Sequence, residues 1–75
     1  MSDIIVAGFY LVMVSITSNG EVVGEVLDHY KDPYDCVVNG TYEESEAPFG
    51  VGYVCIEDVI HQVILSKHLP LVLIL

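Results

Sequence analysis

The strongest constraint on the fold is a long apolar segment near the start of the chain, residues 4–17, with the sequence IIVAGFYLVMVSIT. It is rich in β-branched and aromatic residues, which favour β-strands. It ends at Ser18-Asn19-Gly20, where Asn-Gly is a strong short-range signal for a hairpin. Both alternating sets of side chains are apolar, so both faces of the predicted strand need cover. We therefore expect an oligomer, most simply a two-fold dimer, to cover its second face.

Residues 21–30, EVVGEVLDHY, are predicted to return as the second strand of this hairpin. Gly24 within this segment marks a bulge or a close approach of another backbone. Lys31-Asp32-Pro33 then ends the pairing, because proline cannot donate a hydrogen bond to a neighbouring strand.

Asn39-Gly40 repeats the hairpin signal further along the chain. Residues 34–38 and 41–44 flank this second hairpin signal. The acidic segment 43–48 follows, and a fourth strand or strand fragment is expected at residues 53–55.

The hydrophobic period then changes to that of a helix. Its apolar stripe at positions i, i+3, i+4, i+7 and i+8 consists of Ile56, Val59, Ile60, Val63 and Ile64. Glu57 and Asp58 fall in the first turn and Lys67 and His68 in the last, which suits the helix dipole, and Pro70 ends the helix. This segment is predicted to be the only helix of the chain.

The chain ends with five apolar residues, which are Leu71, Val72, Leu73, Ile74 and Leu75. Left free, such a segment would aggregate. We expect it to pair as a strand, in the same sheet or in a partner's, and so to serve self-association. The sequence thus predicts an α+β fold, a mainly antiparallel sheet of four to five strands in the order ββββαβ with one amphipathic helix packed on one face.

Length and composition support a single domain over residues 1–75 that associates with itself. The chain has 75 residues, and 53% of them are hydrophobic before glycine is counted, against roughly 45–50% with glycine in ordinary globular chains. A domain this small buries only about 60–65% of the surface that its unfolded chain exposes. Part of the apolar excess should therefore meet another chain.

Charge excludes several partners. Eleven acidic residues against two basic ones give a formal net charge of -9, and ten of the acids fall between Glu21 and Asp58. So few bases leave no direct electrostatic grip on nucleic acid, and an anionic membrane surface would repel the chain. Residues 4–16 are also shorter than the roughly 20 residues that a spanning helix needs.

The two cysteines, Cys36 and Cys55, match no CxxC pair. We expect two reduced and mostly buried thiols, with a single disulfide as the alternative. Met1-Ser2-Asp3 carries no basic residue ahead of the apolar segment, unlike a signal peptide, and a cytoplasmic location is expected.

Catalytic and metal-binding patterns are weak. Asp28, Asp32 and Asp35 could hold a hard cation, but their spacing is not that of an EF-hand, and a solvated turn between two strands is the preferred explanation. The potential zinc ligands are scattered through different elements, and they are Cys36, Cys55, His61 and His68. No nucleophile elbow or phosphate-binding loop is present. We expect no enzyme, no metal and no cofactor.

An acidic, tyrosine-bearing surface is the more informative pattern, because tyrosine is enriched at interface hot spots. Its predicted members, which would bind a protein partner with a basic surface, are Asp28, Tyr30, Asp32, Tyr34, Asp35, Tyr42, Glu43, Glu44 and Glu46. Alternate strand residues repeat at about 6.8 Å, so Glu44 and Glu46 could imitate successive phosphates. Two copies would match the charge of roughly 30 Å of duplex DNA.

In size, acidity and lack of catalytic motifs the chain resembles the inhibitors that bacteriophages make against host nucleases and defence systems. The resemblance implies a small inhibitor or regulator of a nucleic-acid-handling or defence protein. Two alternatives stay open. One is a homo-oligomeric small-molecule binder that uses Tyr30, Tyr34, Lys31 or Lys67, and the other is a structural assembly protein.

Overall fold

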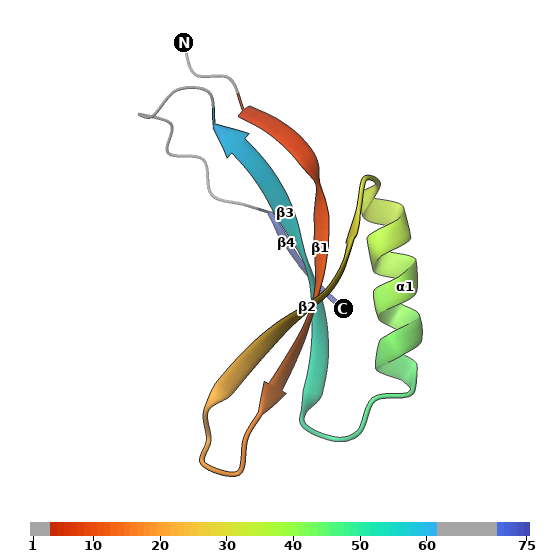
Figure 1. The fold of residues 1–75 in the computed structure, drawn as a ribbon. Coiled ribbons are helices and arrows are strands. Elements are labelled where there is room, and N and C mark those ends of the chain that lie inside the picture. The colour runs from red at the N-terminus through yellow and green to blue at the C-terminus, as the bar shows by residue number, and fades with distance from the viewer. Residues whose placement is uncertain (1–3, 62–70) are drawn as a thin grey trace.

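The computed structural model describes residues 4–61 and 71–75. Within them the chain forms a four-stranded antiparallel sheet with one helix packed against it (Figure 1). The elements in chain order are β1 (Ile4–Ile16), β2 (Val22–Tyr30), α1 (Pro33–Ser45), β3 (Val51–His61) and β4 (Val72–Ile74). The strands lie side by side in the order β2-β1-β3-β4. The predicted α+β class is confirmed, but the element order is ββαββ rather than ββββαβ.

The first hairpin forms as predicted. β1 pairs with β2 from Phe9 opposite Tyr30 to Ile16 opposite Val22. The turn between them is closed by a hydrogen bond from the Thr17 N–H to the Glu21 carbonyl at 2.8 Å. β1 lies inside the sheet, because β3 pairs with its other edge. The long apolar segment therefore forms the strand with which both β2 and β3 pair.

The predicted helix over residues 56–64 is wrong where the structure describes it, because Ile56 to His61 belong to β3. In β3 this segment pairs with the first half of β1, with Ile56 opposite Tyr10 and Ile60 opposite Ile5. β-branched residues pack well on a pleated sheet, and β1 needs a partner along this edge. The tertiary pairing therefore overrides the helical spacing. Val63, Ile64, Lys67, His68 and Pro70 lie outside the described residues.

The second predicted hairpin, at Asn39-Gly40, is also wrong, because both residues lie within α1. The Asp32 side chain caps this helix by accepting a hydrogen bond from the Tyr34 N–H at 2.8 Å. Pro33 occupies the first turn, where its missing N–H costs nothing. The proline that ends β2 pairing thus also begins a helix.

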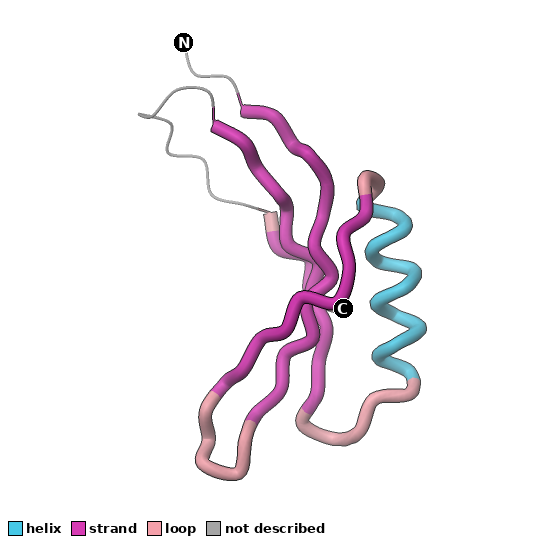
Figure 2. Tube along the Cα trace, viewed as in Figure 1, coloured by secondary structure: helices cyan, strands magenta, loops and turns pink. Residues whose placement is uncertain are grey.

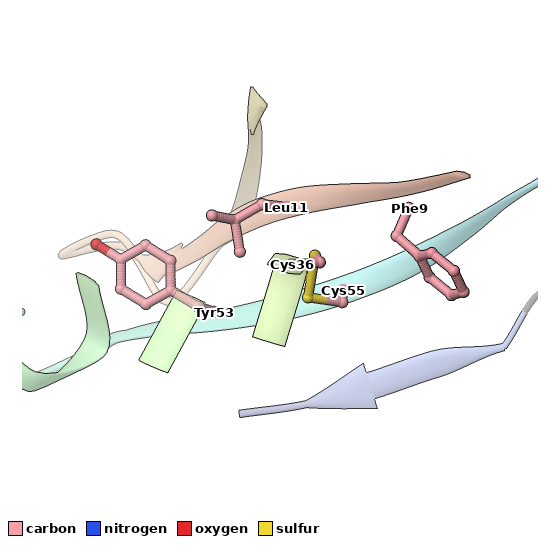
Figure 3. Packing of buried hydrophobic residues seen from close by; sticks show 5 residues of the cluster. All are labelled: Phe9, Leu11, Cys36, Tyr53 and Cys55. Atoms are coloured by element: carbon pink, nitrogen blue, oxygen red, sulfur yellow. A yellow bond between two sulfur atoms is a disulfide. The ribbon is translucent and has the colours of Figure 1, made fainter. Parts of the chain in front are cut away.

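The core lies between α1 and the middle of the sheet. It is built from Phe9 and Leu11 on β1, Cys36 on α1, and Tyr53 and Cys55 on β3 (Figure 3). Both cysteines are fully buried, as predicted, but they form a disulfide instead of two reduced thiols. Packing of α1 against β3 brings their Cα atoms to 6.2 Å, inside the range of about 4.4–6.8 Å that disulfides require.

The C-terminal segment pairs as a strand, as predicted, and its partner is the same chain. β4 lies antiparallel to β3, with Leu73 opposite Cys55. The side chains of Leu73 and Leu75 pack against the core cluster. Val72 and Ile74 alternate to the other face and are exposed. Self-association through Leu71–Leu75 stays a prediction. Two of its five side chains, Leu73 and Leu75, already pack against the core of the same chain.

Candidate functional site

The outer side of α1 carries a ridge of exposed apolar and aromatic residues. Tyr34, Val38 and Tyr42 follow one another at four-residue intervals, which places them on one side of the helix. The exposed fractions of the two tyrosines are 71% and 64%, so neither serves the core. This ridge, which we call the α1 ridge, is the part of the predicted tyrosine-bearing surface that solvent reaches.

Acidic residues surround the α1 ridge. Asp32 caps the helix and Asp35 lies in its first turn. At the other end Glu43 and Glu44 lie in the last turn and Glu46 is the C-terminal cap. A helix N-terminus favours negative charge and a C-terminus disfavours it. The first two acids therefore stabilise the helix, whereas the last three oppose its dipole.

Tyr30 joins β2 to this acidic region. Its side chain is half-buried and packs against the core cluster. Burial raises the pKa of Tyr30, and the nearby carboxylates of Asp28, Glu43 and Asp35 raise it further, Asp28 most of all. The structure thus brings these carboxylates, from β2 and both ends of α1, into one electrostatic neighbourhood.

Acidic residues are segregated to the helix side of the sheet. Five belong to α1 or its caps. Three strand acids share the face that α1 covers, because they lie opposite core-facing residues of β1: Glu25 opposite Met13, Asp28 opposite Leu11 and Glu57 opposite Phe9. Of the remaining acids in the described part of the chain, Glu21 follows the turn and Asp58 lies on the other face.

The predicted partner-binding residues therefore gather at the end of β2 and on α1, with two differences from the expectation. Tyr30 and Glu44 are half-buried, and one carboxylate oxygen of Glu44 is buried with no hydrogen-bond partner. The phosphate-like repeat expected for Glu44 and Glu46 in a strand is wrong, because these residues end a helix. A surface that imitates nucleic acid would have to use helical spacing instead.

A second polar cluster crosses the other face of the sheet. His29 on β2 reaches over Gly8 on β1 to Asp58 on β3, with 3.1 Å between its Nε2 and the carboxylate Oδ2. The ring of Tyr10 packs edge-on against His29 with centroids 4.8 Å apart. A Cβ at Gly8 would lie 2.5 Å from the His29 ring, so glycine makes the contact possible. A glycine inside a strand can mark such a close approach, but from the sequence it was expected at Gly24 and not at Gly8.

Among residues 4–61 and 71–75 there is no group of three or more side chains suited to hold a metal ion. Asp28, Asp32 and Asp35 do not form such a group, and Cys36 and Cys55 are bonded to each other. In the same part of the chain there is no pocket and no helix long and apolar enough to cross a membrane.

Comparison with known proteins adds no relative: no family model, no curated protein and no solved structure matches the chain. The features that bear on function are therefore the acidic helix side of the sheet and the face opposite it.

Proposed function

We propose that this protein is a small regulator or inhibitor that binds a basic surface of a protein partner through the outer side of α1. The observation that carries the proposal is the segregation of charge. Five acidic residues of α1 and its caps surround an exposed ridge that begins with Tyr34 and ends with Tyr42. Three more acids, on β2 and β3, share this side of the sheet without belonging to the helix. Complementary charge steers such an encounter, and tyrosines in the centre supply contact area at low entropic cost.

The last turn of α1 gives independent support. Glu43, Glu44 and Glu46 face the negative end of the helix dipole, and no basic residue lies in the last turn. Each such charge costs about 0.3–1 kcal/mol at low salt. A bound basic group would relieve this repulsion, so the acids that destabilise the free helix would stabilise the complex.

The chemistry of the partner follows from the same surface. Sites built to hold nucleic acid are the commonest strongly basic surfaces on proteins. A nucleic-acid-handling or defence protein therefore fits best, with this chain in competition with its nucleic acid. An origin in a bacteriophage would agree with this role and rests on the resemblance of size and charge.

The test is capture from a host-cell lysate with two matched variants. Glu43→Gln/Glu46→Gln removes two charges from the end of α1, and Glu21→Gln/Glu25→Gln removes two from the β1–β2 hairpin. We expect the unaltered chain and the hairpin variant to retain a partner that high salt releases, and the helix variant to lose it. Equal loss in both variants, or no partner at either salt, would contradict the proposal.

A stability measurement separates the dipole argument from binding. In urea unfolding, the free energy of unfolding of the helix variant should exceed that of the unaltered chain by about 0.3–1 kcal/mol for each charge removed. The same variant should bind the partner less well. The hairpin variant should show neither effect. A helix variant that is not stabilised would remove the second support.

The cytoplasmic location stays a prediction, and the Cys36–Cys55 disulfide weighs against it, because disulfides persist mainly in oxidising compartments. Alkylation of intact producing cells, followed by mass measurement of the chain, would decide. Labelled thiols place it in a reducing compartment, and unlabelled ones in an oxidising compartment.

A further inference from the structure

No described element covers the face of the sheet opposite α1 (Figure 2). Large apolar side chains are exposed on this face. We call it the open face and define it by six exposed side chains: Tyr10, Ile16, Val22, Val26, Val72 and Ile74. Their exposed fractions run from 37% for Tyr10 to 84% for Ile74. They come from β1, β2 and β4. β3 lies between β1 and β4 and adds the half-buried Val54 and Ile56 to the same face, and Val12 of β1 is buried among these side chains.

The strand register shows how uniform this surface is. Val12 of β1 lies opposite Val26 on one side and Val54 on the other. The next position on the same face, Val14, lies between Gly24 and Gly52. Charge enters only at one end, where His29 and Asp58 are paired with each other. From Val12 to Ile16 the residues paired on this face are all apolar or glycine.

The projected area of the open face is that of a large apolar patch on a monomer and is smaller than one side of a standard protein interface. Three strands over the seven residues from Tyr10 to Ile16, with the short β4 beside them, cover about 400 Å² in flat projection at strand spacings of about 4.8 Å and rises of about 3.3 Å. Protruding side chains make the accessible area larger. The largest apolar patch on a typical monomer is about 300–600 Å², and each partner in a stable complex buries about 800 Å².

We propose that a second copy of this chain packs its open face against the open face of the first, as two stacked sheets related by a two-fold axis. The distribution of charge favours a second copy over a basic protein as the partner of the open face. Among the acidic residues of the described strands, Asp58 lies on the open face and is paired with His29. The others, Glu25, Asp28 and Glu57, lie on the helix side. A basic protein would therefore find little opposite charge on the open face. A second copy matches it with an equally apolar surface and leaves both acidic helix sides outward.

Repulsion between the two acidic copies is limited in this arrangement. Stacked sheets lie about 10 Å apart, and each α1 lies on the far side of its own sheet. The acidic sides are thus separated by more than the Debye length of about 8 Å at physiological salt.

Edge-to-edge pairing suits the chain less well than face packing. The free edge of β2 carries Glu25 and Asp28, and charged residues on an edge strand oppose the addition of another strand. The other edge is β4, which has just three residues.

The test compares the same substitution on the two sides of the molecule. Val26→Lys places a charge in the open face, and Val38→Lys places one on α1 at a similarly exposed valine. Light scattering after size exclusion should give twice the chain mass of 8.3 kDa for the unaltered chain and for Val38→Lys, and 8.3 kDa for Val26→Lys. Circular dichroism checks that each variant is folded.

A milder variant covers the case in which Val26→Lys does not fold. Val26→Thr keeps the β-branched shape and adds one hydroxyl, and sedimentation should show a dimer dissociation constant raised at least tenfold. The proposal is overturned if the unaltered chain is monomeric at micromolar concentration, if a folded Val26→Lys stays dimeric, or if Val26→Thr dissociates no more readily. Glu43→Gln/Glu46→Gln should leave the dimer intact, which keeps this proposal separate from that for α1.

Discussion

Reduction of the Cys36–Cys55 disulfide should remove a large part of the stability of this fold. The bond joins α1 to β3 through the centre of the core (Figure 3). α1 itself buries little, with Cys36 and Gly40 as its fully buried residues. The disulfide is therefore the firmest connection between the helix and the sheet.

The size of the effect follows from the loop that the bond closes. The cysteines are 19 positions apart, and closing a loop of about 20 residues lowers the entropy of the unfolded chain enough to stabilise the fold by about 3 kcal/mol at 25 °C. A chain of this length has a total free energy of unfolding of roughly 4–11 kcal/mol. Loss of the bond should thus cost between a quarter and most of the stability.

Urea unfolding followed by circular dichroism measures this cost. With a denaturant slope of about 1 kcal/mol per molar urea, reduction should lower the midpoint by about 3 M. The double variant Cys36→Ala/Cys55→Ala should show at least the same loss, and reductant should not change its midpoint, which controls for other effects of the reagent. Equal midpoints for the oxidised and reduced unaltered chain, or two alkylatable thiols in the untreated protein, would refute the reasoning.

Three other substitutions test particular contacts. Gly8→Ala should lower the free energy of unfolding by at least about 1–3 kcal/mol in urea, because φ is 151° and the new Cβ would lie 2.5 Å from the Tyr30 carbonyl oxygen. Gly40→Ala, which would strengthen an isolated helix by about 1 kcal/mol, should destabilise this protein because its Cβ would meet the side chains of both Leu75 and the buried Leu11. In a double-mutant cycle, Leu75→Ala should relieve the first of these contacts and leave the second. Tyr30→Phe should remove one tyrosine that ionises above pH 10.0 from an ultraviolet titration, because burial and then Asp28 raise the pKa of Tyr30.

Each of these tests has a result that would contradict it. A Gly8→Ala variant as stable as the unaltered chain would mean that His29 does not cross β1 as described, and additive effects of Gly40→Ala and Leu75→Ala would mean that the two sites do not touch. The pKa of Tyr30 is raised in the folded state, so Tyr30 contributes stability that is fully present below pH 10.0. This stability is lost as the pH rises through the pKa of the folded state. An unchanged alkaline loss of stability in Tyr30→Phe would count against the raised pKa.

Local signals predicted the parts of the fold that depend on local chemistry. The β1–β2 hairpin follows from an apolar segment and one Asn-Gly turn, and both are properties of adjacent residues. The start of α1 was equally readable, since Asp32-Pro33 is a helix cap followed by a first-turn proline. The Asn39-Gly40 hairpin signal led to the wrong prediction for this segment. In the structure the Asp32 cap and the packing of Cys36 stabilise a helix there, and they outweigh the hairpin preference of Asn39-Gly40.

Non-local pairing decided what the sequence could not. Residues 56–61 carry a helical stripe, yet they form the second half of β3 because β1 has an unpaired edge there. The contact between His29 and Asp58 joins residues 29 positions apart, so no spacing rule would detect it. The acids at the end of β2 and on α1 could be grouped from the sequence because they all lie between residues 28 and 46. Glu25 and Glu57 share the same side of the sheet only through strand pairing, and they were not predicted.

Each face of this sheet destabilises an isolated chain in a different way. The open face leaves large apolar side chains in water, and the end of α1 holds carboxylates against the helix dipole. A second copy would remove the first cost and a basic partner the second, and neither blocks the other because the surfaces lie on opposite sides of the sheet. A dimer built this way would present two acidic helices facing away from each other. It would therefore bind two separate basic proteins, or two distant sites, more readily than two neighbouring sites on one surface.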